Sequence, residues 1–295
     1  MVSLINTIET CHDDMIHGAE LDYYGLYLAT CSSDNSVKIF DVKNEEHVLV
    51  AELVGHRGPV WEVSWAHPKF GNVLASCSYD RKVIFWKKTG PTWHKSYEYN
   101  SESSVNSIAW APHEFGMILA CASSDGSISF LTFNTEHNTW DSEKIPNAHA
   151  IGCNSISWFP STTFPTMGNL QKQPVKRLAS GGCDNYVKLW IEKNGRWFEE
   201  TRLEAHSDWV RHVEWAPTYG GCKTQIASAS QDRHVIIWTS DNMTTWTSRT
   251  LNVFDDVVWS VSWSLTGKML AVTGADSKIS IWKENKDHHW TSVTD

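Results

Sequence analysis

Short segments in which apolar and polar residues alternate recur along the chain. Five segments carry the pattern clearly and a sixth carries a weaker form: VWEVSW (60–65), VNSIAW (105–110), CNSISW (153–158), VRHVEW (210–215), VWSVSW (258–263) and, more weakly, IHGAEL (16–21). Alternation with a period of two is typical of β-strands that bury one face. The pattern therefore predicts six copies of a first strand.

A second block follows each first strand and contains an Asp at a fixed place. The six residues are Asp34, Asp80, Asp125, Asp184, Asp232 and Asp276, separated by 46, 45, 59, 48 and 44 positions. In five copies an aromatic residue comes six positions later, and in the third it comes after five: Phe40, Trp86, Phe130, Trp190, Trp238 and Trp282. The residues after the Asp mostly favour tight hairpins. Each copy is therefore predicted to continue with a second strand, a turn and a third strand.

A fourth strand is predicted to close each repeat, and it often opens on a Trp. These residues are Trp93, Trp140, Trp197, Trp246 and Trp290. Repeats of this length are typical of propellers and other repeat architectures. The fourth repeat is longer because of the Pro-containing segment 160–177, which we expect to be an exposed insertion between its first two strands.

A His precedes the first strand in four of the repeats. The residues at this place are His12, His56, Ser101, His149, His206 and Phe254. An active site would not be copied once per repeat, so we interpret the four His residues as structural. The chain also lacks the common nucleotide-binding, metalloprotease and serine-hydrolase motifs. We therefore expect no enzyme activity, no catalytic or metal-binding residues and no cofactor.

The repeat resembles the blades of WD-repeat β-propellers. Gly55–His56, Ala205–His206 and the Asp-x5-Trp blocks carry the resemblance, which covers nearly the whole chain. It implies an all-β fold, a six-bladed WD-repeat β-propeller in one domain over residues 1–295. In such blades the His, a second-strand Ser or Thr, the turn Asp and the third-strand Trp form a hydrogen-bond chain.

The resemblance implies three complete hydrogen-bond chains of this kind. They are His56, Ser76, Asp80 and Trp86; His149, Ser180, Asp184 and Trp190; and His206, Ser228, Asp232 and Trp238. In the first repeat His12, Thr30 and Asp34 are present, but Phe40 lacks an indole N–H. In the third and sixth repeats Cys121 and Val272 replace the hydroxyl, so we expect Asp125 and Asp276 to serve the turn alone.

Composition adds limits on partners and compartment. The net charge of −9 argues against a general phosphate-binding surface, so we expect no direct contact with nucleic acid. Seven Cys without a C-x-x-C motif, with Cys31 and Cys77 at equivalent places, indicate buried thiols. The N-terminal stretch has no apolar core typical of a leader. We expect an intracellular protein that reaches membranes only through partners.

Counting strands predicts an unfinished propeller. HHWTSVTD (288–295) fits as the fourth strand of the sixth repeat, so the N-terminal strand is left over; it comprises Val2, Ser3, Leu4, Ile5, Asn6, Thr7 and Ile8. A strand edge without a neighbour leaves backbone N–H and C=O groups unpaired. A partner can pair them by adding its own strands to the sheet, which is β-augmentation. We therefore expect an open six-bladed propeller whose gap, between the first and sixth blades, takes a seventh blade in trans.

Longer segments narrow the resemblance. Residues 16–42, 51–87, 103–126, 205–218 and 263–285 resemble the small WD-repeat subunit of the COPII outer coat, which is shared with the Y-shaped scaffold complex of the nuclear pore. The resemblance implies a structural subunit that pairs with an α-solenoid coat partner or a related solenoid nucleoporin. It also implies a role in a coat-like complex of nutrient signalling. The expected locations are the cytoplasm, COPII vesicles, endoplasmic reticulum exit sites and the nuclear pore.

A second function class remains open at this point. A propeller can instead read short peptides at its central opening, as a ubiquitin-ligase receptor or a histone-tail binder does. Trp61, Arg211 and Trp259 share one register at the start of the first strand, and Trp and Arg are enriched among interface anchors. We interpret them as candidate partner contacts, with blade core as the alternative for the two Trp residues.

Overall fold

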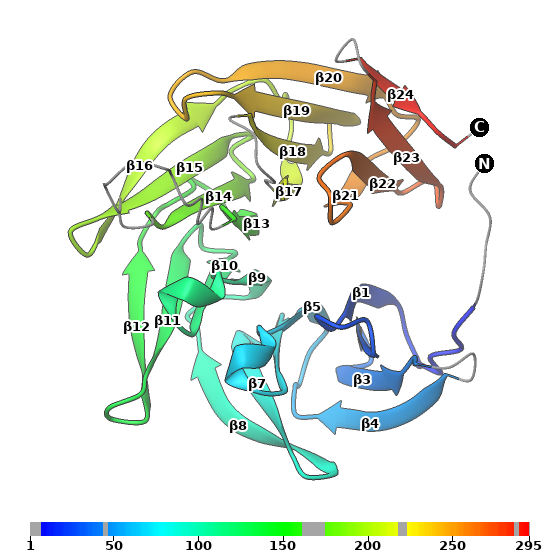
Figure 1. Ribbon diagram of the computed structural model, residues 1–295, viewed down its shortest axis with the longest axis vertical. Helices are drawn as coiled ribbons and strands as arrows, with labels where there is room; N and C mark the ends of the chain where they lie inside the picture. The colour runs from blue at the N-terminus through cyan, green and yellow to red at the C-terminus, as the bar shows by residue number, and fades with distance from the viewer. Residues whose placement is uncertain (1–6, 44–46, 161–174, 218–222, 286–288, 295) are drawn as a thin grey trace, which may run out of the picture. The chain divides into compact units, whose positions relative to one another are not determined.

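The computed structural model describes residues 7–43, 47–160, 175–217, 223–285 and 289–294. In these residues the strands form six four-stranded antiparallel sheets, and each sheet uses four consecutive strands (Figure 1). The chain divides into two compact units with three sheets each, and the boundary lies between Ala148 and His149. The six predicted repeats are thus six blades of an all-β WD-repeat propeller.

The first unit holds blades one to three. Its strands are β1 (Ile16–Leu21), β2 (Tyr27–Ser32), β3 (Ser36–Asp41) and β4 (Val48–Val54); β5 (Val60–Trp65), β6 (Val73–Ser78), β7 (Lys82–Thr89) and β8 (Thr92–Asn100); and β9 (Val105–Trp110), β10 (Ile118–Ser123), β11 (Ile128–Asn134) and β12 (Thr139–Ile145). Short 3-10 turns, Pro68–Phe70 and His113–Phe115, follow β5 and β9.

The second unit holds blades four to six. Its strands are β13 (Cys153–Trp158), β14 (Arg177–Gly182), β15 (Val187–Lys193) and β16 (Arg196–Leu203); β17 (Val210–Trp215), β18 (Thr224–Ser230), β19 (His234–Ser240) and β20 (Thr247–Val253); and β21 (Val258–Trp263), β22 (Met269–Gly274), β23 (Ile279–Glu284) and β24 (Trp290–Ser292). All six alternating segments found in the sequence coincide with a first strand, which confirms that prediction.

Each turn between the second and third strands is held by its Asp. A carboxylate oxygen of Asp80 accepts the amide of Lys82 at 3.0 Å, and the residue between them, Arg81, has a φ of 70°. The third blade places Gly126 there, with a φ of 81°. Because left-handed backbone strains most side chains, the Asp hydrogen bond helps to hold the turn where the residue is not Gly.

The hydrophobic core lies between neighbouring blades rather than within one. In the first unit, Val37 and Ile39 of the first blade pack with Val60, Leu74 and Trp86 of the second. Similar clusters join the second blade to the third, the fourth to the fifth, and the fifth to the sixth. Within each unit, neighbouring blades therefore bury their facing sides against each other.

Pairs of Trp rings meet edge to face within four blades. In the second blade the ring centroids of Trp65, at the end of β5, and Trp93, on β8, lie 5.7 Å apart. The equivalent pairs in blades four, five and six are Trp158–Trp197, Trp215–Trp246 and Trp263–Trp290, at 5.8, 6.2 and 5.6 Å. Edge-to-face contacts at such distances are favourable, so each pair ties the innermost strand to the outermost segment of its blade.

The register of the third blade corrects one alignment made from the sequence. Phe130 pairs with Ala120, as Phe85 of the second blade pairs with Ala75. The residue that pairs as Trp86 does is Leu131, whose partner is Leu119. Phe130 is therefore not the shifted counterpart of the strand-ending Trp, and a buried Leu occupies that place.

Two segments singled out in the sequence fall largely outside the described residues. The insertion 160–177 lies between β13 and β14 as predicted, but its residues 161–174 are not described. Of the leftover strand, residues 2–6 lie outside the described residues, and Thr7 and Ile8 belong to no strand. β24 pairs with β23, which confirms that the C-terminal segment supplies the fourth strand of the sixth blade.

Candidate functional site

The complete hydrogen-bond chains bring together the residues that the resemblance selected. In the second blade His56 Nδ1 lies 3.1 Å from Asp80 Oδ2, and His56 Nε2 lies 2.8 Å from Ser76 Oγ. Trp86 Nε1 donates to the same oxygen at 2.9 Å. A neutral imidazole fits these contacts, because Nδ1–H donates to the carboxylate and Nε2 accepts the Ser76 hydroxyl.

The fourth and fifth blades repeat this geometry. In the fourth blade His149 lies 2.7 Å from both Asp184 Oδ1 and Ser180 Oγ. Trp190 donates to Ser180 Oγ at 2.8 Å. The fifth-blade contacts have distances of 2.8 to 2.9 Å and join His206, Ser228, Asp232 and Trp238. Their three imidazoles are buried, so a metal ion or substrate would have no open position there.

The carboxylates of these chains are held in the ionised form. Burial opposes ionisation of Asp80, but hydrogen bonds from His56 and from the Arg57 amide lower its pKa to about 2. The same causes lower the pKa of Asp184 and Asp232. Groups fixed in one protonation state, with every donor matched to an acceptor, suit a structural role better than proton transfer.

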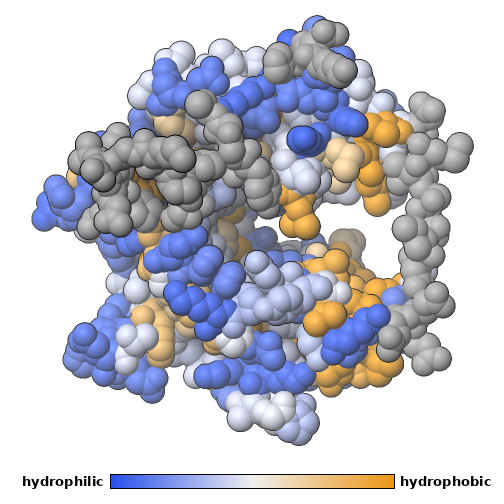
Figure 2. All heavy atoms as spheres, in the orientation of Figure 1, coloured by the Kyte–Doolittle hydropathy of each residue, from blue (hydrophilic) through white to orange (hydrophobic). Residues whose placement is uncertain are grey.

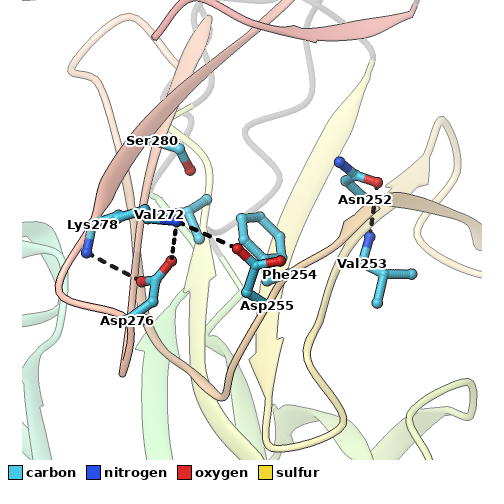
Figure 3. Close-up of a pocket in the computed structure, with 9 residues that line it drawn as sticks. Asn252, Val253, Phe254, Asp255, Val272, Asp276, Lys278 and Ser280 are labelled. Carbon is cyan, nitrogen blue, oxygen red and sulfur yellow. Dashed lines mark hydrogen bonds and ion pairs between the residues drawn. The ribbon is translucent and has the colours of Figure 1, made fainter. Parts of the chain in front are cut away.

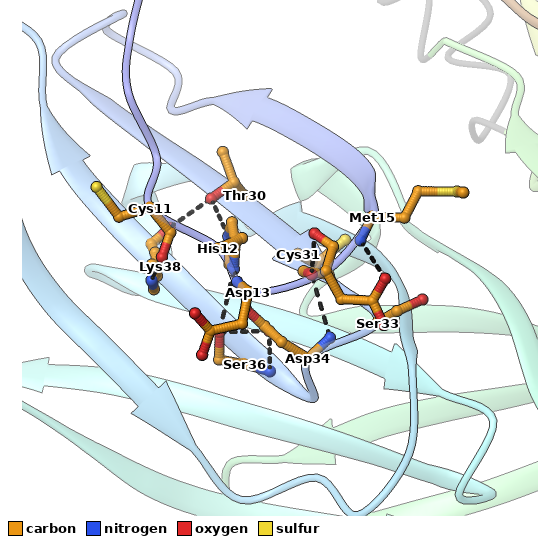
Figure 4. A network of polar contacts seen from close by, with 12 residues as sticks. Cys11, His12, Asp13, Met15, Thr30, Cys31, Ser33, Asp34, Ser36 and Lys38 are labelled. Carbon is orange, nitrogen blue, oxygen red and sulfur yellow. Dashed lines mark hydrogen bonds and ion pairs between the residues drawn. The ribbon is translucent and has the colours of Figure 1, made fainter.

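The first blade keeps the chain without its indole (Figure 4). His12 Nδ1 lies 2.7 Å from Asp34 Oδ2, and His12 Nε2 lies 2.9 Å from Thr30 Oγ1. Thr30 Oγ1 lies 3.5 Å from the Lys38 carbonyl, and Lys38 Nζ donates to the Cys11 carbonyl. The fifth blade has the same hydroxyl to carbonyl contact, from Ser228 to Ile236 at 3.5 Å, so what the first blade lacks is the indole donor alone.

The sixth blade has a pocket near the place of the missing His (Figure 3). It has a volume of about 220 Å³ and lies between the end of β20 and strands β22 and β23. Phe254 and Val272 line it in place of an imidazole and a hydroxyl. Trp282 Nε1 donates to Ser280 Oγ at 2.9 Å instead. Asp276 accepts the Lys278 amide at 3.1 Å, so it holds the turn as expected.

The third blade also lacks the chain, and its Asp does more than hold the turn. Asp125 accepts the Ser127 amide at 3.0 Å. Its other oxygen lies 3.1 Å from Lys144 Nζ on β12. Cys121, at the hydroxyl position, is buried, and burial raises the pKa of its thiol. The expectation that Asp125 serves the turn alone is therefore too narrow.

Buried carboxylates on the first strands link neighbouring blades, and the sequence reading missed them. Glu62 Oε2 on β5 accepts the Ile108 amide of β9 at 2.7 Å, and Glu214 Oε2 on β17 accepts the Trp263 amide of β21 at 2.7 Å. Burial raises the pKa of Glu62 to about 7 and that of Glu214 to about 8. The alternating pattern placed both side chains on a polar face, but only the neighbouring strand shows that this face is enclosed.

The three candidate contact residues have different surroundings. Trp61 of the second blade is half-buried; it donates to Ser104 Oγ of the third blade at 3.3 Å and meets the His17 ring of the first blade at 4.7 Å, so it contacts both neighbouring blades. Arg211 and Trp259 lie together in the second unit, with the guanidinium 4.8 Å from the ring centre. Trp259 is exposed, so the core alternative does not describe it.

Two apolar residues at the ends of the blade series are exposed, although their equivalents are buried. Ile16 begins β1 and is 43% exposed, whereas the residues that begin the other first strands are fully buried: Val60, Val105, Cys153, Val210 and Val258. Ile279 begins β23 and is 66% exposed, whereas its equivalents are fully buried: Val37, Val83, Ile128, Val187 and Val235. Large exposed apolar side chains on sheet faces mark interaction surfaces.

Figure 2 shows hydrophobic side chains at the surface in both places. One region lies over the first blade, where exposed apolar residues are Ile16, Leu21, Val48, Leu49, Val50 and Val54. The other lies over β22 and β23 of the sixth blade, where Met269 and Ile279 are exposed. Blades in the middle of each unit show no such concentration among the described residues.

No group of three or more His, Cys, Asp or Glu side chains in the described ranges is placed to hold a metal ion. No helix in this part of the chain has the length and apolar character that crossing a bilayer requires. Cys31 and Cys77 are free and buried, which confirms the interpretation of these equivalent thiols as core.

Comparison with known proteins gives both a family and close relatives. The family described as "WD domain, G-beta repeat" matches residues 3–41, 47–87, 140–190, 197–239 and 247–283. The match leaves out residues 88–139, which hold β8 of the second blade and β9, β10 and β11 of the third, where the His, hydroxyl and Trp are all replaced. "Protein SEC13 homolog" of Drosophila melanogaster is 60% identical over 99% of this chain and 84% of the relative.

Two further relatives extend the similarity to vertebrates and fungi. "Protein SEC13 homolog" of Homo sapiens is 56% identical over 100% of this chain and 94% of the relative. "Protein transport protein SEC13" of Mycosarcoma maydis is 45% identical over 98% of this chain and 94% of the relative.

Proposed function

The chain belongs to the SEC13 family of WD-repeat β-propellers, and on that premise we propose that it is a structural scaffold subunit completed by a partner's β-strands. The proposed partner is an α-solenoid protein that donates a seventh blade. As a member of this family the chain acts by assembly and has no catalytic activity. The printed names of the fungal relatives, "protein transport protein", agree with a role in transport.

The observation that carries the proposal is the exposure of Ile279. Its equivalent Val235 packs between the fifth blade and the first strand of the sixth, because the sixth blade covers the fifth. The described residues hold no strand after β24, and Ile279 on β23 is exposed. Met269 on β22, which pairs with Lys283 at the other end of β23, is also exposed. A donated sheet would give this face the cover that the other blades already have.

The first blade supports the same proposal from the other end of the series. Val60, the equivalent of Ile16, packs against Val37 and Ile39 of the preceding blade. The described residues hold no strand before β1, and Ile16 is exposed. The sixth blade already takes its fourth strand from β24, so strand exchange between the chain ends is not needed to complete it. A three-stranded donation beside the leftover strand 2–8 would complete a seventh blade.

We propose that this partnership builds the outer coat of COPII vesicles, which act between the endoplasmic reticulum and the Golgi. With a related solenoid nucleoporin it builds the Y-shaped scaffold of the nuclear pore, and a third assembly is a coat-like complex of nutrient signalling. The protein would then occur in the cytoplasm, at endoplasmic reticulum exit sites and on vesicles, and at nuclear pores. Contact with membranes would be indirect.

We call the exposed side of the sixth blade around Ile279 the free face. A substitution on this face tests the proposal. Ile279→Asp places a charge on the surface that the donated blade should cover, while Phe198→Asp changes a residue that is 49% exposed on β16 of the fourth blade. Both proteins should fold, because both side chains lie at the surface. Co-purification with the α-solenoid coat subunit should be lost for Ile279→Asp and kept for Phe198→Asp. Equal capture by both variants would contradict the proposal.

A further inference from the structure

Only two of the 17 Trp residues are exposed, and both stack on the same Arg. All 17 lie in the described residues, and the others are buried or half-buried. Trp209 is 39% exposed and Trp259 is 48% exposed. The centre of the Arg211 guanidinium lies 5.0 Å from the Trp209 ring and 4.8 Å from the Trp259 ring. Two indoles that could have been buried instead flank one cation at the surface.

The guanidinium lacks a carboxylate partner. Arg211 donates through Nη2 to Gln231 Oε1, and its Nε has no hydrogen-bond partner. The Arg side chains that form ion pairs among the described residues are Arg177 and Arg202, not Arg211. The carboxylate of Asp208 accepts the Trp209 amide at 2.7 Å. Burial lowers the pKa of Arg211. The charges of Cys183 and Asp208 oppose this shift without outweighing burial. A half-buried cation that no salt bridge satisfies gains from an incoming anion.

Neither the fold nor the hydrogen-bond chains require this arrangement. The place of Trp209, directly before the first strand, is taken by Pro59, Gly152 and Val257 in other blades, and these blades form without an indole there. Arg211 corresponds to Trp61, whose ring lies between two blades, and to Asn154, whose amide donates to the Val210 carbonyl at 2.9 Å. The fifth blade alone places an Arg in this register.

We propose that Trp209, Arg211 and Trp259 form a docking site for an acidic segment of a partner protein. A carboxylate of that segment pairs with the guanidinium, whose planar donors suit such a group. The apolar side chains beside the carboxylate lie on the two indoles. Trp and Arg together are the residues most often found at the energetic centre of protein interfaces. We name these three residues the Trp–Arg clamp.

The Trp–Arg clamp is distinct from the free face proposed to receive a seventh blade. Trp209 and Arg211 belong to the fifth blade, whose sheet packs on the sixth. Only Trp259 belongs to the sixth blade, and its exposure alone could reflect a missing neighbour. The informative variants are therefore those of Trp209 and Arg211. Ile279→Asp should lose binding of the solenoid partner and keep binding of the acidic peptide. Arg211→Met should lose binding of the acidic peptide, so failure of one proposal can be told from failure of the other.

The test uses the full chain and two fluorescein-labelled peptides. One peptide alternates Glu with Leu, and the other replaces each Glu by Lys. Fluorescence anisotropy should show saturable binding of the Glu peptide only, and the affinity should fall as salt is added. Arg211→Met and Trp209→Ala should each weaken binding about tenfold or more. Arg211→Lys should recover part of the affinity, because it keeps the charge but loses the planar donors.

Matched controls come from the outer strand of the fourth blade. Arg196→Met and Phe198→Ala change exposed residues on β16 and should leave peptide affinity unchanged. Because a clamp variant could also unfold, indole N–H resonances of the wild-type protein provide a second measurement. The indole N–H signals of Trp209 and Trp259 should shift on titration with the Glu peptide. Binding of the Lys peptide with equal affinity, no binding of the Glu peptide, or shifts confined to other Trp residues would overturn the proposal.

Discussion

His56 and its counterparts show how much a single position can be predicted from repetition. The sequence placed the His, Ser, Asp and Trp in register, and the structure brings each set within 3.2 Å. The buried Glu62 and Glu214 could not be predicted in the same way. Each bonds to a residue about 46 or 49 positions away, on a strand whose identity as a neighbour depends on the fold.

Removal of one carboxylate should destabilise the fold without changing the interfaces. Asp80→Ala deprives the His56 imidazole and the Arg57 and Lys82 amides of their acceptor. A buried donor left without a partner costs about 1–3 kcal/mol. The variant should melt at a lower temperature in calorimetry and still bind the solenoid partner. A fully stable variant that failed to bind would show that Asp80 belongs to a binding site.

The buried Glu residues predict that stability falls as the pH rises. The folded state raises the pKa of Glu214 from 4.5 to about 8, so between these values the folded chain holds a proton that the unfolded chain has released. The free energy of unfolding therefore decreases with rising pH across this window. Glu214→Gln keeps a neutral group at this place and should flatten the decrease. Melting temperatures measured at several pH values would test this, and an unchanged slope would contradict it.

At the scale of the element, alternation predicted the first strands well because each has one face against the next blade. The third strand of the third blade was harder, because the aromatic signal at Phe130 is one position from the residue that takes the Trp place, Leu131. Only pairing with Leu119 settles the register. The two short 3-10 turns after β5 and β9 also escaped prediction, since their Pro and Gly residues indicate a turn of any kind.

The sixth blade should accept a rebuilt hydrogen-bond chain. Phe254→His together with Val272→Ser supplies the two missing groups beside Asp276 and Trp282, next to a pocket that is already open. A completed chain should add roughly 1 kcal/mol to the free energy of unfolding and raise the melting temperature by a few degrees. The single variant Val272→Ser is the control, and it should destabilise the blade because it buries a hydroxyl without the His. A double variant less stable than this control would refute the prediction.

The insertion 160–177 should be dispensable for the fourth blade. It joins β13 to β14, and the equivalent connections in the other blades are short. A short Gly-Ser link should preserve folding, because the free energy of loop closure changes only slowly with loop length. Circular dichroism and solubility of the shortened protein would test this. An insoluble product would contradict it.

At the scale of the whole molecule, counting strands predicted six blades and a leftover strand. The count could not predict which side chains would be exposed, because Ile16 and Ile279 have the same sequence surroundings as their buried equivalents. Their exposure depends on the position of the blade in the series. The Trp–Arg clamp was predicted only in part, since Arg211 and Trp259 were selected by register and Trp209, one residue before the first strand, was not.

Deletion of residues 1–9 should weaken binding of the solenoid partner. The leftover strand 2–8 is proposed to border the donated blade, and the completed interface should exceed roughly 2,000 Å², a size typical of permanent complexes. Deletion should leave the hydrogen-bond chain of His12 in place, because that chain begins after the deleted segment. Unchanged solenoid binding in a pull-down would contradict the proposal, as would an isolated chain whose N-terminal strand pairs with the sixth blade in a closed ring.

The edge-to-face Trp pairs give the molecule an optical signature. Two indoles 5.6 to 6.2 Å apart at a fixed angle couple their electronic transitions, and such coupling produces a paired positive and negative band in far-ultraviolet circular dichroism. Each of the four pairs spans one blade from its innermost to its outermost segment, so the band reports blade closure rather than strand content. Trp93→Phe would remove the contribution of the second blade to this band and leave the contributions of the other three pairs. Unfolding could then be followed blade by blade, without any added label.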